Sequence, residues 1–273
     1  MGTPDDPFQS LIGWAEDPLV NITVMALIVL GGLGFFVWSD VWDKHSFCRL
    51  RLHTKIVLTA TAGLLLFGFG WTLLFEWSNP ATLGAFDTPH KLLAAAFESV
   101  TLRTAGFNTI DLGALTGPSQ AVSCLLMFIG GSPGSTAGGI KTVTAAVLVL
   151  TAISAFCGRT TVSAFGRTIA PRSIMNAVTL LMAGGVLCLV GACAIAGIED
   201  APFHQCLFEA VSAFGTVGVS MGLTPTLAAA SRVILIVMMY MGRVGVLTLG
   251  VAVFMRRREP PRLKYPDADA FIG

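Results

Sequence analysis

The chain has 273 residues, of which 54% are hydrophobic and only 12% are charged, and its mean hydropathy is +0.75. A soluble globular domain carries about 25% charged residues, so this composition excludes an ordinary soluble domain and favours a chain that lies in lipid. The net charge of +1 gives no electrostatic basis for binding nucleic acid, so we expect no nucleic-acid partner.

The basic residues are concentrated in three segments, at residues 44–55, 159–172 and 256–264. The connections that alternate with these segments are acidic or mixed. Lysine and arginine favour the cytoplasmic side of a membrane. The pattern therefore predicts five membrane crossings, with the N-terminus outside and the C-terminus in the cytoplasm.

The first predicted elements are an external N-terminal segment and one apolar helix. Residues 1–17 are polar and acidic, whereas residues 18–39 contain no Asp, Glu, Lys or Arg. A helix of about 20 apolar residues is long enough to cross a membrane. We therefore expect one spanning helix over residues 18–39.

Two longer units follow, at residues 53–158 and 171–257, and each has the same order of segments. A first apolar span, at residues 56–75 or 173–198, is followed by a short amphipathic segment, a polar turn and another apolar stretch. The remaining residues, 258–273, form a polar tail that we expect in the cytoplasm. The predicted fold class is thus an all-α polytopic membrane protein.

The short segments belong to an internal repeat. The sequence AFESVTLRTAGF at residues 96–107 resembles LFEAVSAFGTVGV at residues 207–219, with one extra residue in the second copy. A helix of about 12 residues spans only ~18 Å, enough to enter a bilayer halfway. We interpret both segments as re-entrant pore helices, the alternative being ordinary surface helices in external loops. A third, partial copy ends in LGGLG at residues 30–34.

Each short segment is followed by a Thr-X-Gly motif. Backbone carbonyls can replace the hydration shell of an ion, and glycine tolerates the backbone angles that turn successive carbonyls toward one axis. We therefore expect a cation selectivity filter, which needs no metal site elsewhere. Its candidate residues are Thr104, Ala105, Gly106, Phe107, Thr216, Val217, Gly218 and Val219.

A glycine-rich stretch interrupts the second apolar part of the first unit. Five glycines and one proline within residues 130–139 cannot sustain a regular helix. A break inside a membrane exposes backbone polar groups and therefore favours a position along a conduction path, as a gate. The candidate gate residues are Gly130, Gly131, Ser132, Pro133, Gly134, Ser135, Thr136, Gly138, Gly139, Lys141 and Arg243.

The two cations in this set have different interpretations. Lys141 either faces a cavity or extends to the cytoplasmic surface. Arg243 has a long uncharged stretch after it and occupies the position that Gly131 holds in the other unit. We expect Arg243 to meet carbonyls of the broken loop.

Two catalytic patterns overlap with the same loop. Gly130 to Gly134 fits the G-x-S-x-G nucleophile motif with Ser132, but that motif needs a preceding strand and His and acid partners. Residues 134–142 nearly fit a phosphate-binding loop, but Ile140 interrupts the G-K-[ST] ending. An intramembrane serine hydrolase stays as an alternative, whereas the main prediction is a non-enzyme.

Taken together, the motifs FESVTLRTAGFN, MFIGGSPGSTAGGIKT, AFGTVG and MGRVG resemble the Trk/Ktr/HKT potassium transporters, and the bacterial Ktr membrane subunit most of all. The resemblance runs from about residue 18 to residue 257. It implies four M1-P-M2 repeats around one pore, one filter glycine per repeat, and channel-like uptake of K⁺, with Na⁺ as the other ion to consider. In these terms residues 53–158 and 171–257 are the third and fourth repeats.

The resemblance also implies a location and partners. It places the chain in the bacterial inner membrane, in contact with lipid, as a homodimer bound to a cytosolic nucleotide-binding regulatory subunit of the TrkA/KtrA type. The chain itself is expected to hold no cofactor, since the nucleotide belongs to the regulator.

The resemblance leaves part of the pore unaccounted for. The first repeat and the second pore helix have no counterpart here, and residues 18–39 would be the last helix of the second repeat. Either the chain is a truncated product or fragment, which would be non-conducting alone, or another polypeptide supplies the missing half. Self-assembly of two copies is a further alternative.

Overall fold

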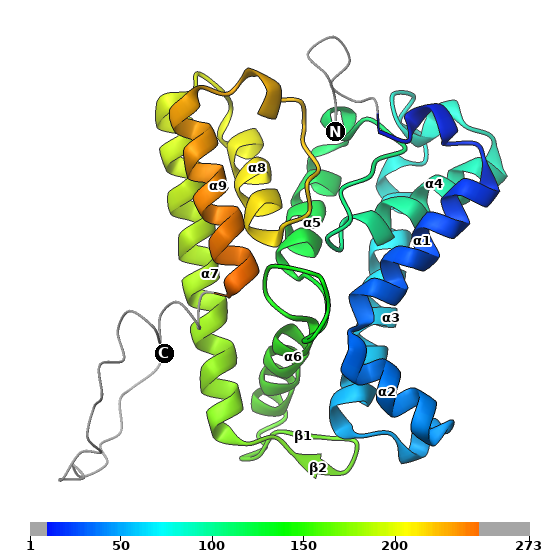
Figure 1. The fold of residues 1–273 in the computed structure, drawn as a ribbon, viewed down its shortest axis with the longest axis vertical. Helices are drawn as coiled ribbons and strands as arrows, with labels where there is room; N and C mark the ends of the chain where they lie inside the picture. The colour runs from blue at the N-terminus through cyan, green and yellow to red at the C-terminus, as the bar shows by residue number, and fades with distance from the viewer. Residues whose placement is uncertain (1–9, 246–273) are drawn as a thin grey trace.

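The computed structural model describes residues 10–245, which are mostly helical (Figure 1). The predicted all-helical class is confirmed in this coarse form. The longer elements are α1 (Pro18–Leu33), α2 (Phe35–Lys44), α3 (Leu52–Glu76), α4 (Thr88–Thr101), α5 (Gly117–Phe128), α6 (Thr142–Phe156), β1 (Ser163–Ala164), β2 (Arg167–Thr168), α7 (Pro171–Ile198), α8 (Phe203–Gly215) and α9 (Ala229–Val244). Single 3-10 turns lie at Ile12–Trp14, Phe47–Arg49, Leu83–Ala85, Leu112–Ala114 and Thr224–Thr226. The predicted tail at residues 258–273, the first part of the N-terminal segment and the end of the last apolar stretch lie outside the described residues.

The elements form two helix groups with a broken helix between them. In Figure 1, α1, α3 and α4 lie on one side, α7, α8 and α9 lie on the other, and α5 and α6 lie between. The chain between α5 and α6 forms a loop at the centre of the molecule. A two-stranded antiparallel hairpin, with Ser163 opposite Thr168, joins α6 to α7.

Two helices, α3 and α7, are long and apolar enough to cross a membrane. They contain the predicted spans at residues 56–75 and 173–198. Neither has a charged residue in its middle. The backbone polar groups of each helix are satisfied by hydrogen bonds within the helix, as a membrane span requires.

The segment predicted as one helix over residues 18–39 is two helices. A break at Gly34 bends α1 and α2 by 91°. Gly34 has φ 83°, a conformation that favours glycine, and a Cβ there would lie 2.7 Å from the carbonyl oxygen of Pro133. The break is therefore fixed by contact with a part of the chain far away in sequence.

Both predicted short segments are helices, α4 and α8, and each packs against the long helix before it. Gly68 of α3 lets Ser99 approach closely, and the Ser99 hydroxyl donates to the carbonyl oxygen of Leu65 at 2.7 Å. In the second group, Gly184 of α7 lies against the ring of Phe214. Small residues thus seat the short helices against their neighbours.

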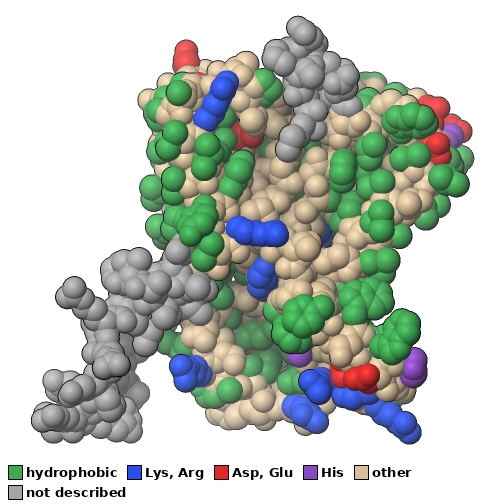
Figure 2. All heavy atoms as spheres, viewed as in Figure 1, with side chains coloured by type: hydrophobic (Ala, Val, Ile, Leu, Met, Phe, Trp, Pro, Cys, Tyr) green, Lys and Arg blue, Asp and Glu red, His purple; other side chains and the backbone are tan. Residues whose placement is uncertain are grey.

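Charge is distributed unevenly along the molecule. Figure 2 shows several Lys and Arg side chains at the end that carries the β1–β2 hairpin and others at the centre and the opposite end, with most of the visible Asp and Glu side chains toward that opposite end. At that opposite end, the buried carboxylate of Glu76 accepts hydrogen bonds from Asn79, Thr82 and Thr116. These hydrogen bonds link the connection that follows α3 to the connection that precedes α5.

Candidate functional site

The two Thr-X-Gly motifs adopt the same backbone conformation. Thr104 and Gly106 have φ of 71° and 85°, and Thr216 and Gly218 have φ of 52° and 90°. Positive φ at alternate positions is uncommon outside glycine, and both threonines share it. The sequence indicated the need for glycine, but it gave no sign that the threonines would adopt this conformation.

A hydroxyl near the end of each short helix braces the motif that follows. Thr101 donates to the carbonyl oxygen of Phe107, and Ser212 donates to the carbonyl oxygen of Val219 at 2.6 Å. These bonds direct both carbonyls toward the short helices. The signal was present in the repeat, where Thr101 and Ser212 occupy the same place, but sequence reasoning did not use it.

A backbone bond completes the brace in each copy. The amide of Ala105 donates to the carbonyl oxygen of Thr101 at 3.1 Å, and the amide of Val217 donates to that of Ser212 at 2.9 Å. Each middle residue is thus held against its helix, so the turn cannot open without losing bonds to the helix.

The two motifs approach each other at their glycines. A Cβ on Gly218 would lie 3.7 Å from the Cα of Gly106. A Cβ on Gly106 would overlap the carbonyl oxygen of Val217. The glycines therefore mark the place where two extended backbones face one another.

The predicted break at residues 130–141 is present, and its ends are joined. Ile129 and Ile140 form an isolated parallel bridge. The Gly130 amide donates to the Ile140 carbonyl at 2.8 Å, and the Ile140 amide donates to the Phe128 carbonyl at 3.1 Å. The chain between them is therefore a closed loop, referred to below as the central loop (residues 130–141).

The central loop contacts the other helix break. Ser132 donates its amide to the Gly32 carbonyl at 3.0 Å, and Phe35 donates its amide to the Gly134 carbonyl at 3.3 Å. The open backbone groups at the end of α1 and the start of α2 thus find partners in the loop. This satisfies polar groups that a helix break would otherwise leave exposed.

Both predicted cations reach the same loop. The guanidinium of Arg243, on α9, donates to the carbonyl of Thr136. Lys141 turns back on its own loop and donates to the Ala137 carbonyl at 2.5 Å. The Lys141 side chain is therefore half-buried and folded back on the loop.

The central loop lies directly against both Thr-X-Gly motifs. A Cβ on Gly130 would lie 3.5 Å from the Cγ2 atom of Thr104, and a Cβ on Gly138 would lie 2.7 Å from the Cγ2 atom of Thr216. Absence of a side chain at these two glycines therefore lets the threonines rest on the loop. The structure brings all the predicted filter and gate residues into one region.

Arg103 belongs to this region, although sequence reasoning assigned it no role. It immediately precedes Thr104 and is only 7% exposed. Its guanidinium donates to the Gly130 carbonyl at 3.1 Å and to the Thr142 hydroxyl at 2.9 Å. The signal in the sequence was a lone arginine, because residues 92–110 contain no other charged residue apart from Glu98.

The glutamates of the two short helices have unlike surroundings. Glu209 accepts from the Ser220 hydroxyl at 2.5 Å, the Met221 amide at 3.2 Å and the Thr224 hydroxyl at 2.6 Å. Glu98 is equally buried, yet neither of its carboxylate oxygens has a hydrogen-bond partner among residues 10–245.

The geometry gives no support to a hydrolase. Ser132 is fully buried, and its hydroxyl has no hydrogen-bond partner in the described part of the chain. A serine nucleophile needs a base within hydrogen-bond reach. Across the same residues, no group of three or more His, Cys, Asp or Glu is arranged to hold a metal ion.

Comparison with known proteins shows the family to which the chain belongs. Residues 7–259 match the family model TrkH, described as a cation transport protein. The chain belongs to the TrkH family. The resemblance seen in the sequence motifs is therefore confirmed at the level of the family.

Two TrkH-type relatives and one solved structure are similar to the chain. Ktr system potassium uptake protein B of Bacillus subtilis is 39% identical over 265 residues, which is 97% of this chain and 59% of the relative. Potassium/sodium uptake protein NtpJ of Enterococcus hirae is 38% identical over 270 residues, covering 97% and 60%. The crystal structure of the potassium transporter TrkH from Vibrio parahaemolyticus has a TM-score of 0.67 at 17% identity, covering 89% of this chain and 53% of that one.

The coverage matters as much as the identity. The chain spans about 60% of the length of these curated relatives. At 17% identity, the solved structure supports the fold alone. The TrkH family is thus established for the chain, and the activity of the whole protein is a matter for proposal.

Proposed function

We propose that this chain supplies part of a potassium-conducting pore in a membrane uptake system. Two relatives are named as potassium or potassium/sodium uptake proteins. The observation that carries the proposal is the pair of braced Thr-X-Gly turns that face each other at Gly106 and Gly218. In this proposal permeation is channel-like, and the membrane potential can drive it, since 100 mV contributes about 2.3 kcal/mol per monovalent cation.

The filter is built from backbone carbonyls. The carbonyls of Thr104, Ala105 and Gly106 are free of the brace that holds Phe107, and the second motif is arranged in the same way. We assign ion contact to the first three residues of each motif, and we assign a bracing role to Phe107 and Val219. A ring of such carbonyls replaces the water that K⁺ loses on entry.

The central loop acts as the gate. It lies against both filter threonines and is held by Arg243 through Thr136. Glycine-rich backbone moves at low cost because it has few side-chain contacts to break. In this proposal, displacement of the loop away from the filter opens the path, and Arg243 favours the closed position.

The complete pore needs more filter segments than this chain contributes. We propose that four segments enclose the ion, with the others from a further part of the polypeptide, a second polypeptide or a second copy. The proposal includes a bacterial inner-membrane location with the basic end in the cytoplasm. It also includes a homodimeric assembly and a cytosolic nucleotide-binding regulatory subunit of the TrkA/KtrA type. The first relative is named as a member of a Ktr system.

The test uses a bacterial strain deficient in potassium uptake. The chain is expressed alone and within an assembly that contains the remaining repeats, and Rb⁺ and Na⁺ uptake are measured. Gly106→Ser is expected to lower the Rb⁺/Na⁺ uptake ratio about tenfold, which corresponds to about 1.4 kcal/mol. Serine at this position clashes with the Val217 carbonyl in a conformation that disfavours side chains.

Gly218→Ser provides a graded comparison, since its Cβ has more room and only the backbone conformation is strained. We expect a smaller fall in the ratio. Gly70→Ser in α3, where a Cβ meets nothing within 4 Å, is the matched control. A ratio that stays unchanged in both filter variants would rule out the filter assignment.

A further inference from the structure

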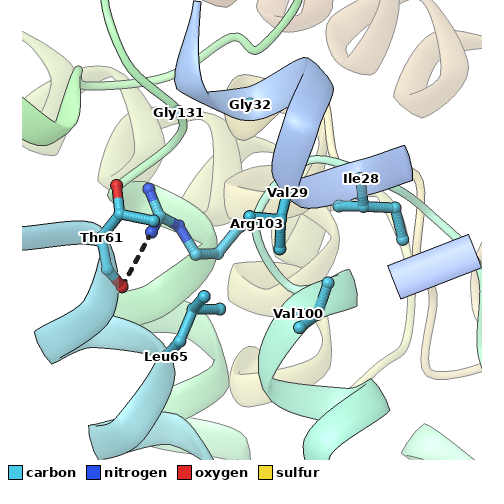
Figure 3. Close-up of a pocket in the computed structure, with 8 residues that line it drawn as sticks. All are labelled: Ile28, Val29, Gly32, Thr61, Leu65, Val100, Arg103 and Gly131. Atoms are coloured by element: carbon cyan, nitrogen blue, oxygen red, sulfur yellow. Dashed lines mark hydrogen bonds between the residues drawn. The ribbon is translucent and has the colours of Figure 1, made fainter. Parts of the chain in front are cut away.

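Arg103 occupies a position between the filter and the gate. Its backbone leads directly into Thr104, and Figure 3 shows its side chain extending to Thr61 of α3. One guanidinium nitrogen donates to the Gly130 carbonyl and to the Thr142 hydroxyl, at 3.1 Å and 2.9 Å. The other terminal nitrogen lies 3.5 Å from the carbonyl oxygen of Thr61 on α3.

The two residues that Arg103 holds, Gly130 at the start of the loop and Thr142 directly after it, are also bonded to each other. The Thr142 hydroxyl donates to the Gly130 carbonyl at 3.1 Å. Arg103, Gly130 and Thr142 thus form a closed triangle of hydrogen bonds at the base of the loop. Moving either loop end requires breaking bonds to the guanidinium.

Burial of the Arg103 guanidinium away from water costs free energy that its contacts must offset. Arg103 is 7% exposed, and in the part of the chain that the structure describes it forms no salt bridge with a carboxylate. A buried cation without a counter-ion is expensive in a membrane protein and marks a functional position. Carbonyl and hydroxyl acceptors, rather than a carboxylate, stabilise this one.

The second unit has no such residue. By the spacing that relates Gly106 to Gly218, the counterpart of Arg103 is Gly215. A Cβ on Gly215 would lie 2.5 Å from the Met127 carbonyl, so a side chain would not fit there. The arginine is therefore specific to the motif whose own unit contains the central loop.

A small pocket lies beside the guanidinium, and α1 forms one of its walls. Its volume is about 20 Å³, and Ile28, Val29 and Gly32 form part of its wall (Figure 3). The Nε atom of Arg103 and the Thr61 hydroxyl, both from wall residues, have no hydrogen-bond partner in residues 10–245. A cavity of this size holds one water molecule, which can satisfy both groups.

We propose that Arg103 is a positioning residue that couples the filter to the gate. It holds the first filter segment and both ends of the central loop as one unit, so that a displaced loop also alters the filter. This inference rests on the proposed function, because it assigns regulation to the same site. Coupling here means that the two segments change conformation together.

Hydrogen exchange followed by mass spectrometry tests the coupling on the full chain, purified in lipid nanodiscs. The reporters are the Ala105 amide in the filter and the Ser132 amide in the loop, both hydrogen-bonded to backbone carbonyls. In Arg103→Gln we expect exchange at both segments to rise about tenfold or more, because bonds from a charged donor are lost. α7 serves as the internal reference and should be unaffected.

Arg243→Gln is the matched comparison, since it removes a different guanidinium from the same loop. Because Arg103 is intact in this variant, coupling predicts faster exchange in the loop and also in the filter segment. In the double variant Arg103→Gln/Arg243→Gln, the further rise caused by the loss of Arg243 should be confined to the loop. Faster exchange in the loop alone in either single variant, or no change in either segment in Arg103→Gln, would overturn the proposal.

Thr142→Val covers the case in which Arg103→Gln fails to fold. It removes the hydroxyl that accepts from Arg103 and keeps the side-chain shape. We expect a rise of several-fold at both segments, and a rise confined to the loop would count against coupling. No ion flux enters this measurement, so its failure is distinguishable from an unchanged Rb⁺/Na⁺ ratio in the filter variants.

Discussion

The unit made by α3 to α6 and the unit made by α7 to α9 carry the same Thr-X-Gly turn, which we propose as a filter segment, on different supports. In both, a hydroxyl of the short helix braces the residue after the filter glycine, and positive φ recurs at the same places. The units differ behind this turn. The first has a buried arginine tied to the central loop, and the second has a glutamate with three hydrogen-bond donors.

This difference suggests a division of work between the units. Glu209 ties α8 to the chain that follows its Thr-X-Gly motif, so the second motif is anchored within its own unit. The first motif is anchored through Arg103 to the segment that we propose as the gate. In the proposed filter, one segment is thus held by its own unit, and the other is placed to respond to the loop.

The largest expected effect comes from removing the anchor of the second unit. In Glu209→Gln, the amide group replaces one acceptor oxygen and faces the donors that the carboxylate now satisfies. We expect the free energy of unfolding to fall by about 2–3 kcal/mol, the range for hydrogen bonds to a charged group. Thermal unfolding of the purified protein in detergent measures this change.

Glu98→Gln is the matched variant in the first unit. Its carboxylate oxygens have no hydrogen-bond partner among residues 10–245, so little bonding is lost. Replacing a buried carboxylate by a neutral amide also reduces a desolvation cost. We therefore expect a change of less than about 1 kcal/mol, or a gain. Equal destabilisation by the two variants would remove the distinction between the anchors.

The sequence allowed part of this comparison to be predicted. Uncharged runs located α3 and α7, and the density of glycine and proline in residues 130–139 located the break between α5 and α6. These features are local, because lipid excludes charge and glycine weakens any helix. The alignment of the two motifs likewise located the two glycines, Gly106 and Gly218, that lie close together in the structure.

The bend at Gly34 and the role of Arg103 could not be predicted in this way. Gly34 follows an apolar stretch that is compatible with a straight helix, and its break depends on contacts with Pro133 and Gly134. Arg103 acts through Gly130 and Thr142, which lie far along the chain. Both features arise from long-range contacts, which a pattern of residue types in one segment does not contain.

A second prediction concerns the contact between the central loop and the second Thr-X-Gly motif. A methyl group on Gly138 overlaps the Thr216 side chain, so Gly138→Ala should destabilise the protein by about 1–3 kcal/mol through overpacking. Thr216→Ala added to this variant should recover part of the loss, with a coupling energy of about 1 kcal/mol. Thermal unfolding of the two single variants and the double variant measures it.

Gly185→Ala is the control for this cycle. It lies in α7, where a Cβ meets nothing within 4 Å, and alanine favours the helix. Its stability should equal or exceed that of the unmodified chain. Strictly additive effects of Gly138→Ala and Thr216→Ala would mean that the loop does not press on the second filter.

The smallest expected effect comes from the two braces, and it separates the filters from each other. Thr101→Val and Ser212→Ala each remove one hydroxyl, at a cost of about 1 kcal/mol. Because each hydroxyl bonds only within its own unit, hydrogen exchange should rise several-fold near Ala105 in the first variant and near Val217 in the second. Thr59→Val removes a hydroxyl that bonds to its own helix and should change neither.

If Thr101→Val also loosens the central loop while Ser212→Ala does not, the two units differ in dynamics as they do in structure. If each brace variant loosens both filters alike, the contact at Gly106 and Gly218, rather than Arg103, transmits the change.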